Sequence, residues 1–413
     1  MTSNIENPIN NDSDIRGRAA LALSSLSPSQ LTFLQNLPKA ELHAHLNGCI
    51  PLKTIKELVD EYVMEVDNDA SVFTTTPSGS GSASEPTTTP RPPKHPLTKT
   101  EILSGYSLLE KFDSELDDIH AFFAPFAIIY ALTNTKGRLR KATRAVLEGF
   151  LGSADGNDDR DSNSNISMTP PQAAYLELRT TPRTTSDMSR LEYLETVLDE
   201  VERYPKDRMG GLIVSLDRKM TLDVVREVVD LAVGLKTGKR RVIGLDLCGD
   251  PLAGNMYSPL LTQCFQDARN AGLGITLHIA ETAQNPSPES IHLLRAFIPD
   301  RLGHATFLDE EAREVVFDGN GHGHEEGKRK IGVEVCLSSN LICKTVPTLE
   351  DHHIRYYLER DHPIAICTDD TLPFRTSLLA EYALLLASAP WGLGMSEGEV
   401  ERVARGGWGM RFL

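Results

Sequence analysis

Short apolar runs alternate along the chain with longer stretches in which apolar residues recur at helical spacing. The short runs are rich in β-branched residues, as strands are, and lie at residues 41–45, 174–180, 211–216, 242–247, 275–279, 301–304, 333–336 and 364–367. The helical stretches include residues 51–63, 136–150, 189–202, 222–235, 260–271, 287–297, 376–389 and 396–405. The pattern therefore predicts eight strands separated by helices, with extra helices near the C-terminus.

The predicted strands are apolar along nearly their whole length rather than at alternate positions. Strands of this kind are covered on both faces, as in a parallel sheet that has helices on each side. Two architectures satisfy this order of elements, a closed (β/α)8 TIM barrel and an open, doubly wound sheet. Hydrophobic patterning alone leaves both open.

Two low-complexity segments interrupt the pattern. Residues 67–96 are rich in Ser, Thr, Pro and Gly, and residues 152–171 are polar and acidic. Neither segment holds enough apolar surface to offset the entropy of ordering it, so both are predicted to be disordered insertions in surface loops. We expect residues 1–30 to form a partly disordered N-terminal arm and residues 31–413 to form one domain.

The charge of the chain argues against two classes of partner. Its 413 residues include 42 basic and 58 acidic side chains, a net charge of −16. An acidic surface is poorly suited to a nucleic-acid backbone or an anionic membrane, although one locally positive pocket can still take a small phosphorylated ligand. The longest apolar run, residues 121–132, is too short to span a bilayer.

The cysteines and the N-terminus bear on the compartment. The six cysteines are scattered and form no Cys-x-x-Cys pair, which is typical of reduced, buried thiols inside a cell. No basic segment followed by an apolar run marks a signal peptide at the N-terminus. We expect a cytoplasmic monomer.

Polar residues with metal-binding or acid–base chemistry gather at the C-terminal ends of the predicted strands. They are His43 and His45 on the first, His278 and Glu281 at the fifth, His304 at the sixth, and Asp369 and Asp370 after the eighth. These ends converge on one face of a closed barrel, whereas a doubly wound sheet would scatter them along a crevice. Their distribution favours the TIM barrel.

The His43-Ala44-His45 sequence places two imidazoles on one side of a strand, where both can reach a single metal ion. A third imidazole and a carboxylate from other strands would complete a nitrogen and oxygen shell of the kind zinc accepts. A pair of hydrogen-bonded structural histidines explains an isolated His-x-His equally well. The matching positions of His278, His304 and Asp369 favour the metal site.

Seven segments together resemble the motifs of the adenosine deaminase family. They are LPKAELHAHLNG (37–48), YLELRTTPR (175–183), DLCGD (246–250), HIAET (278–282), RLGHA (301–305), EVCLSSN (334–340) and CTDD (367–370). The resemblance covers most of the chain outside the N-terminal arm, the two insertions and the last dozen residues. It implies a (β/α)8 barrel that hydrolyses the 6-amino group of a purine with one zinc ion per chain.

The resemblance also implies a role for individual residues. The zinc ligands are His43, His45, His278 and Asp369, and the metal activates a water molecule. His304 orients that water and accepts its proton, and Asp370 holds the attacking oxygen and binds the purine. Glu281 donates a proton to purine N1, for which it must be protonated. The backbone of Gly249 binds the purine edge.

Asn47 bears on the substrate. Adenosine deaminases proper carry Asp at the matching position, facing the 5′-hydroxyl, and a carboxylate there would repel a 5′-phosphate. The HLNG and ELRTTPR sequences resemble the adenosine deaminase-like branch that acts on N6-methyl-AMP. We therefore expect a purine nucleotide as the substrate, most of all N6-methyl-AMP or an AMP-like nucleotide that yields IMP and an amine. Candidate phosphate contacts are Lys39, Arg179 and Arg183, each of which a surface or barrel-rim charge explains equally well.

Three alternatives remain from the sequence. The same chemistry could act on adenosine or adenine, which Asn47 argues against. Another amidohydrolase on the same barrel would often need a bridging lysine at a strand end, and no predicted strand ends in Lys. A non-catalytic purine-binding protein is the third, and the complete set of reactive residues argues against it.

Overall fold

The computed structural model describes residues 14–73, 93–111, 122–123, 125–154, 171–318 and 330–412. The disorder expected for residues 67–96, for residues 152–171 and for part of the N-terminal arm falls mostly on residues outside these ranges. In the part of the chain that is described, no helix combines the length and the apolar character needed to cross a membrane.

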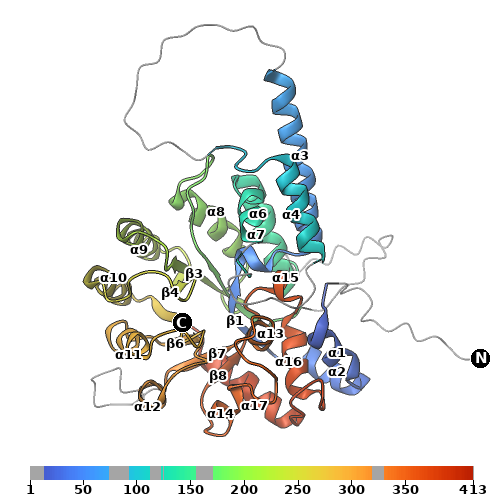
Figure 1. Ribbon diagram of the computed structural model, residues 1–413, viewed down its shortest axis with the longest axis vertical. Helices are drawn as coiled ribbons and strands as arrows, with labels where there is room; N and C mark the ends of the chain where they lie inside the picture. The colour runs from blue at the N-terminus through green and yellow to red at the C-terminus, as the bar shows by residue number, and fades with distance from the viewer. Residues whose placement is uncertain are drawn as a thin grey trace, which may run out of the picture.

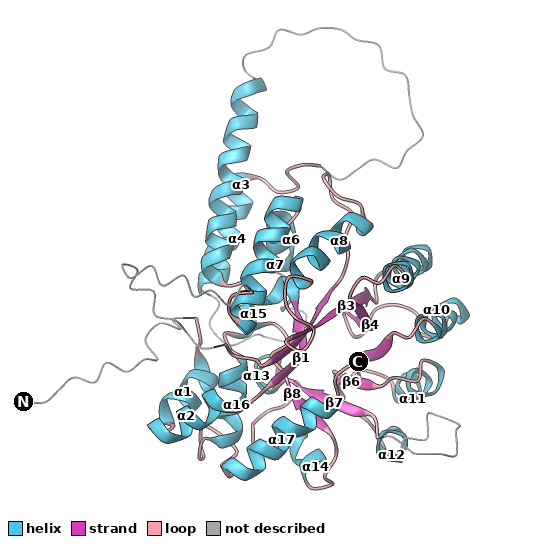
Figure 2. Cartoon of the chain, turned by 180° about the vertical axis from the view of Figure 1, so that it is seen from behind, coloured by secondary structure: helices cyan, strands magenta, loops and turns pink. Residues whose placement is uncertain are grey.

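Eight strands form one sheet in sequence order, and every neighbouring pair is parallel. They are β1 (Ala40–His45), β2 (Tyr175–Thr180), β3 (Met209–Asp217), β4 (Val242–Cys248), β5 (Gly274–Ile279), β6 (Arg301–His304), β7 (Gly332–Val335) and β8 (Ile364–Ile366). The backbone of Asp369 closes the ring, because its amide donates to His43 O at 2.8 Å and its carbonyl accepts from His45 N at 3.0 Å. The fold is a (β/α)8 TIM barrel, as predicted (Figures 1 and 2).

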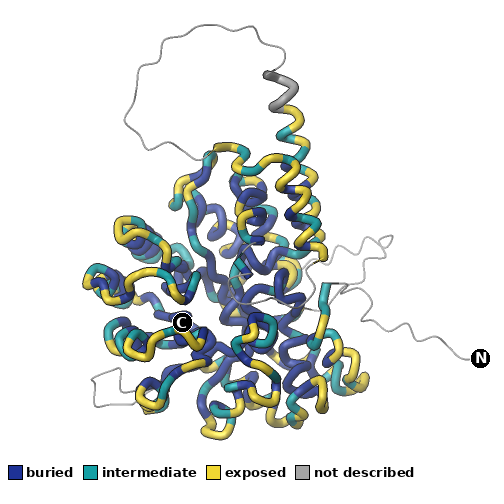
Figure 3. Tube along the Cα trace, viewed as in Figure 1, coloured by how far each residue is buried: buried dark blue, intermediate teal, exposed yellow. Residues whose placement is uncertain are grey.

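Helices surround the barrel and bury one face each against it (Figure 3). In chain order they are α1 (Gly17–Ser25), α2 (Pro28–Asn36), the 3-10 helix η2 (Leu46–Cys49), α3 (Leu52–Phe73), α4 (Lys99–Lys111), α6 (Phe126–Leu132), α7 (Lys136–Leu151), α8 (Arg190–Val201), α9 (Leu222–Thr237), α10 (Pro259–Asn270), α11 (Ser287–Ala296), α12 (Glu310–Asp318), α13 (Leu337–Ile342), α14 (Ile354–Leu358), α15 (Thr371–Phe374), α16 (Leu378–Leu386) and α17 (Glu397–Gly409). Most predicted helices and strands agree with these bounds to within a few residues.

Two helices extend further than the sequence pattern predicts. Helix α3 continues to Phe73, past residue 67 where we placed the start of the first insertion. No glycine or proline occurs in that stretch, so nothing in the local sequence ends the helix there. Helix α17 continues to Gly409 rather than residue 405. Within the N-terminal arm, α1 packs against α16, so part of the arm belongs to the barrel's outer layer.

The segment after α17 closes the lower end of the barrel, where the strands begin. The amide of Phe412 donates to Glu177 Oε1 at 2.7 Å, and the guanidinium of Arg301 lies 3.7 Å from the Phe412 ring centre. The ring also occupies the space that a side chain at Gly274 would need. In both ribbon views the C label projects onto the ring of strands (Figures 1 and 2).

Buried charged side chains fill the middle of the barrel and form ion pairs with one another. Arg301 contacts Glu177 and Glu334, both at 2.7 Å, and Arg179 contacts Glu334 at 2.8 Å and Asp246 at 3.5 Å. All five side chains are at most 1% exposed. Buried charges are tolerated when they are paired in this way, because an unpaired one would keep its full desolvation cost.

Candidate active site

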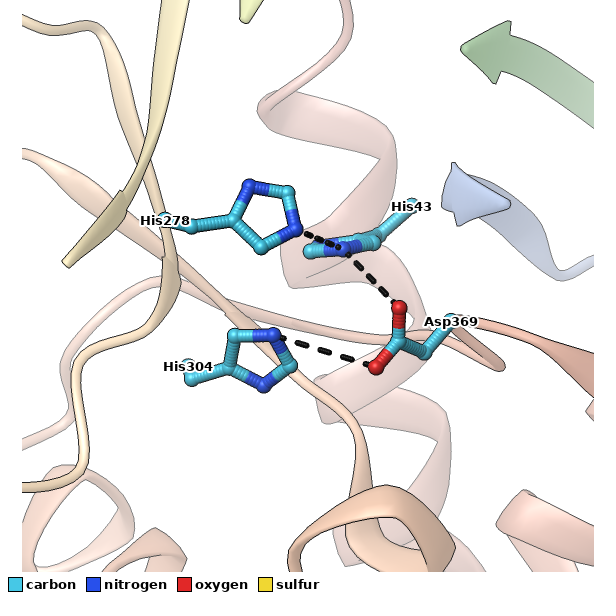
Figure 4. Close-up of side chains that lie close together, drawn as sticks. All are labelled: His43, His278, His304 and Asp369. Atoms are coloured by element: carbon cyan, nitrogen blue, oxygen red, sulfur yellow. Dashed lines mark hydrogen bonds and ion pairs between the residues drawn. The ribbon is translucent and has the colours of Figure 1, made fainter. Parts of the chain in front are cut away.

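The predicted metal ligands meet at the upper end of the barrel, where the strands end. His43 and His45 project to the same side of β1 because side chains alternate along a strand. His278 comes from β5 and Asp369 from the segment after β8. Figure 4 shows His43, His278 and Asp369, together with His304, turned toward a common centre.

The distances between the ligand atoms fit one metal ion. The Nε2 atoms of His43, His45 and His278 lie 3.0, 3.2 and 3.3 Å from one another, and Asp369 Oδ1 lies 3.4 and 3.5 Å from the first two. Tetrahedral zinc with Zn–N bonds of about 2.0–2.1 Å separates its nitrogens by about 3.3–3.4 Å. Three nearly buried imidazole nitrogens that face one another at this spacing leave lone pairs pointing at a shared point, which a divalent cation would satisfy.

Carboxylates behind the histidines fix which nitrogen faces the centre. Glu334 Oε2 lies 2.7 Å from His43 Nδ1, and Asp246 Oδ1 lies 3.0 Å from His278 Nδ1. Each carboxylate holds the proton on Nδ1, so that Nε2 presents its lone pair to the metal position. The ion network in the barrel therefore orients two of the ligands.

His304 also lies close enough to His43, His278 and Asp369 to belong to a metal-binding set with them. Its Nε2 lies 3.8 Å from Asp369 Oδ2, whereas His45 Nε2 lies 3.5 Å from Asp369 Oδ1. The shorter spacings favour His45 as the ligand and leave His304 beside the metal position. Neither nitrogen of His304 has a hydrogen-bond partner within the described residues, although the ring is buried.

The pKa values of Glu281 and His304 are shifted in opposite directions. Burial, reinforced by the negative charge of Asp369, raises the pKa of Glu281 to about 8. Burial lowers the pKa of His304 to about 3. At neutral pH the glutamic acid can donate a proton and the imidazole can accept one, and such a pair of opposed shifts is characteristic of acid–base catalysis.

The pKa values of the two adjacent aspartates are also shifted in opposite directions. Burial opposes ionisation of both, but hydrogen bonds and charges from His43 and its neighbours hold the pKa of Asp369 well below its usual range. Burial and the nearby Asp369 raise the pKa of Asp370 well above its usual range. Asp369 is thus held as an anion, as a metal ligand would need to be, and Asp370 Oδ1 has no hydrogen-bond partner in the described structure.

Backbone strain is concentrated at the same strand ends. His304, Asp369 and Ala280 have φ values of 60°, 62° and 46°, a region that residues other than glycine seldom adopt. Gly249, after β4, has φ of 93°, and a side chain there would collide with Asp217. Such conformations persist where surrounding structure enforces them, often at functional sites.

A polar cluster lies beside the metal position at Asn47. The Asn47 amide donates to Tyr193 Oη at 3.2 Å and accepts from Thr133 Oγ1 at 3.5 Å, while Arg183 Nη2 donates to the same Thr133 oxygen at 2.9 Å. The Arg183 guanidinium also lies 4.0 Å from the ring centre of Tyr130. Arg183 forms no ion pair within the residues described, so its charge is available to an anionic ligand.

The structure does not bring the other two predicted phosphate contacts to this cluster. Lys39 lies at the opposite end of β1, where its ammonium donates to the carbonyls of Leu34 and Leu37. Arg179 points into the barrel, where Glu334, Asp246 and the Leu42 carbonyl occupy it. Both cations already have buried acceptors and lie away from the Asn47 cluster, whereas Arg183 lies within it.

Sequence reasoning assigned no role to Glu334, Asp246 or Thr133. Glu334 and Asp246 each stand inside a run of apolar strand residues, GVEVC and GLDLC. A lone carboxylate within a buried strand needs a partner, so these positions did carry a signal. Thr133 lies between α6 and α7 with no motif around it, and its place beside Asn47 follows only from the fold.

A closed parallel barrel with imidazoles and a carboxylate around one point at its upper end defines a metal-dependent TIM-barrel hydrolase. The sequence profile described as adenosine deaminase matches residues 167–413. An adenosine deaminase-like protein of Drosophila melanogaster is 32% identical over 370 residues, which are 87% of this chain and 88% of the relative. The chain belongs to the adenosine deaminase family and is a hydrolytic deaminase.

Solved structures agree with this assignment. The crystal structure of Arabidopsis N6-mAMP deaminase superimposes with a TM-score of 0.68 at 28% identity, and the match covers 92% of this chain and 95% of that one. The Arabidopsis ADAL protein complexed with IMP gives the same TM-score and identity, with coverage of 92% and 94%. The family and the barrel predicted from the sequence are confirmed.

Proposed function

We propose that this protein uses one zinc ion to deaminate a 6-aminopurine nucleotide, most of all N6-methyl-AMP, with water, giving IMP and methylamine. The observation that carries the proposal is the meeting of three imidazole Nε2 atoms within 3.3 Å of one another. Beside them lies Glu281, whose pKa burial raises to about 8. His43, His45, His278 and Asp369 would hold the ion. When bound, zinc acidifies a water molecule toward neutral pH.

The surrounding residues divide the proton transfers between them. The neutral His304 accepts a proton from the attacking water, and Asp370 aligns that water beside C6 of the purine. The protonated Glu281 donates to N1 of the purine as C6 becomes tetrahedral. The amine then takes the proton held by His304 as the C6–N6 bond breaks. The oxygen on C6 loses its own proton, which returns Glu281 to its protonated form. The backbone amide of Gly249 is a further candidate contact to the purine edge.

Three observations support a nucleotide over a nucleoside. Asn47 carries no charge, and Arg183, which is without an ion-pair partner in the described chain, reaches the same threonine as Asn47. The neighbouring structures named N6-mAMP deaminase, or complexed with IMP, take nucleotides. A neutral amide and a free guanidinium favour a 5′-phosphate, which a carboxylate would repel.

Kinetics with three substrates test the proposal. We expect kcat/KM to be highest for N6-methyl-AMP, lower for AMP and lowest for adenosine, with release of methylamine from the first. A preference for adenosine or adenine over both nucleotides would contradict the assignment of substrate. Metal analysis should find one zinc per chain. A protein that binds purine nucleotides but releases no amine, with or without zinc, would instead be a non-catalytic binding protein.

We further propose that the protein acts as a monomer in the cytoplasm. All six cysteines are buried and free, which suits a reducing compartment. Light scattering on a sizing column should give the mass of one chain, and a fluorescent fusion should distribute through the cytoplasm. A dimer mass, or a fusion confined to an organelle, would contradict the respective statement.

A further inference from the structure

A basic pocket lies at the lower end of the barrel, opposite the metal position. It has a volume of about 620 Å³ and is bounded by the starts of β2, β3 and β4, the loops that precede β3 and β4, and the segment after α17. Six of its lining side chains are basic and one is acidic. The basic ones are Lys206, Lys236, Lys239, Arg240, Arg241 and Arg411, and the acidic one is Asp207. On a chain with a net charge of −16, this is a local reversal of sign.

Most of the positive charge in the pocket is uncompensated. Arg240 is paired with Asp199 at 2.9 Å and Glu202 at 3.0 Å. Lys206, Lys236 and Lys239 form no ion pair with any described residue. Among the described residues, the side chains of Arg241 and Arg411 donate to the backbone carbonyls of Val201, Met209 and Trp408. Glu202, which pairs with Arg240, also lies near Arg241 and accepts from its backbone amide at 2.8 Å. Cations gathered without counter-charges repel one another, and a polyanion would relieve that repulsion.

One wall of the pocket is aromatic and held in place. The guanidinium of Arg411 lies 4.9 Å from the ring centre of Tyr175, whose hydroxyl donates to Glu177 at 3.0 Å. Phe412 is fixed between Arg301 and the barrel strands. Val242 and Ile243 continue this apolar surface. Both rings are buried and already covered, so the cationic rim is the part of the pocket that suits a ligand, one with several negative charges.

We propose that this basic pocket binds a polyphosphate chain, either inorganic or that of a nucleoside triphosphate, through its cationic rim. The volume lies within the range of single small-ligand sites, roughly 300–1,000 Å³. Confinement of the charge to one pocket favours a small ligand over a nucleic acid, which would need a continuous basic surface. The site is separate from the deaminase centre, since it lies at the other end of the barrel.

Calorimetric titration tests this with the full-length, metal-loaded protein at low ionic strength and in excess magnesium. The probes are ATP and inorganic triphosphate, each with excess IMP in the cell and the syringe so that any monophosphate site is filled. We expect one site per chain with a dissociation constant below ~100 μM. Tighter binding of ATP would identify contacts to the nucleoside, and equal binding would identify the polyphosphate as the recognised group; both support the proposal.

A pair of matched variants locates the site. The double variant Lys236→Gln/Lys239→Gln removes two unpaired cations of the pocket and should weaken binding roughly tenfold. The control Lys53→Gln/Lys56→Gln removes two exposed lysines of α3 and should bind as the native protein does. Absence of binding at millimolar concentrations, or equal affinity in both double variants, would overturn the proposal. Circular dichroism of each variant checks that it is folded.

Discussion

The middle and the upper end of the barrel both bury charged and polar side chains, yet they differ in how those groups are satisfied. In the middle, each of the five buried charged side chains has at least one hydrogen-bond partner, as Arg301 has in Glu334. At the upper end, both nitrogens of His304 and one oxygen of Asp370 have no hydrogen-bond partner within the described chain. The backbone there is also strained at His304, Asp369 and Ala280.

The difference separates structure from function. A buried polar group left without a partner costs on the order of 1–3 kcal/mol, so it persists only where a ligand or a reaction uses it. Buried polar groups that have hydrogen-bond partners stabilise the fold, and those without a partner are available to a ligand or a substrate. Substitutions at the upper end should therefore change turnover, and substitutions in the middle should change stability.

The largest effect is expected from Glu281→Gln at the upper end. The amide keeps the shape of the side chain but cannot donate the acidic proton, so kcat should fall by about 10²- to 10⁴-fold. The zinc content, measured by mass spectrometry, should stay at one per chain. Glu310→Gln on exposed α12 is the control and should be fully active. Loss of zinc from the Glu281 variant would contradict the role as a proton donor.

Glu334→Gln in the middle of the barrel should mainly reduce stability. Two arginines and His43 would lose their shared counter-charge, so the free energy of unfolding should fall by about 3 kcal/mol. Glu311→Gln breaks an exposed ion pair with Arg295 of similar length, 2.8 Å, and should cost less than ~1 kcal/mol. Urea unfolding of both variants makes the comparison. Equal losses would show that burial of the network adds nothing.

Asn47→Asp tests whether the neutral amide beside the active site allows a 5′-phosphate to bind. A carboxylate beside Thr133 and Arg183 would repel a 5′-phosphate and pair with the free guanidinium, so kcat/KM for N6-methyl-AMP should fall by about tenfold. Adenosine, which has no phosphate, is the internal control. The kcat/KM of the same variant for adenosine should fall little or rise. A uniform loss on both substrates would indicate damage to the barrel instead.

The smallest expected effect is a pH dependence of stability that comes from His362, at the lower end of the barrel. His362 donates to Ile331 O at 2.8 Å just below β7, and burial lowers its pKa to about 4. The unfolded chain therefore binds this proton more readily, near pH 6.5, and stability should decline as the pH falls from about 6.5 to about 4. Melting temperatures of native protein and His362→Gln across this range should diverge in slope. Parallel slopes would exclude His362 as a source of acid sensitivity.

The sequence predicted the eight strands because buried β-branched runs interrupted by helical spacing admit few other arrangements. The metal position was predictable for a related reason, since polar residues such as His278 and Asp369 stand where apolar strands end. Arg179 shows that the hydrophobic pattern does not contain the direction of a side chain on a buried strand. Every position of β2 is buried, so periodicity cannot say whether a side chain points into the barrel or toward its rim.

The lower end was not predicted at all. Its contacts join residues far apart in sequence, such as Glu177 with Arg301 and Phe412, and no local motif announces them. The uncompensated lysines of the basic pocket are equally invisible, because each looks like an ordinary surface residue until the fold places it beside the others. Pairing of charges is a property of three-dimensional proximity, which a single sequence records only through recognised motifs.

The position of Phe412 at the base of the barrel has a consequence for folding during protein synthesis. Its partners on β2 leave the ribosome more than 230 residues earlier than Phe412 does, since the bond to Glu177 spans 235 positions. Until Phe412 emerges, the base of the nascent barrel is open and Glu177 lacks one of its hydrogen-bond donors. A nascent chain stalled before residue 410 should therefore remain sensitive to protease at the base of the barrel.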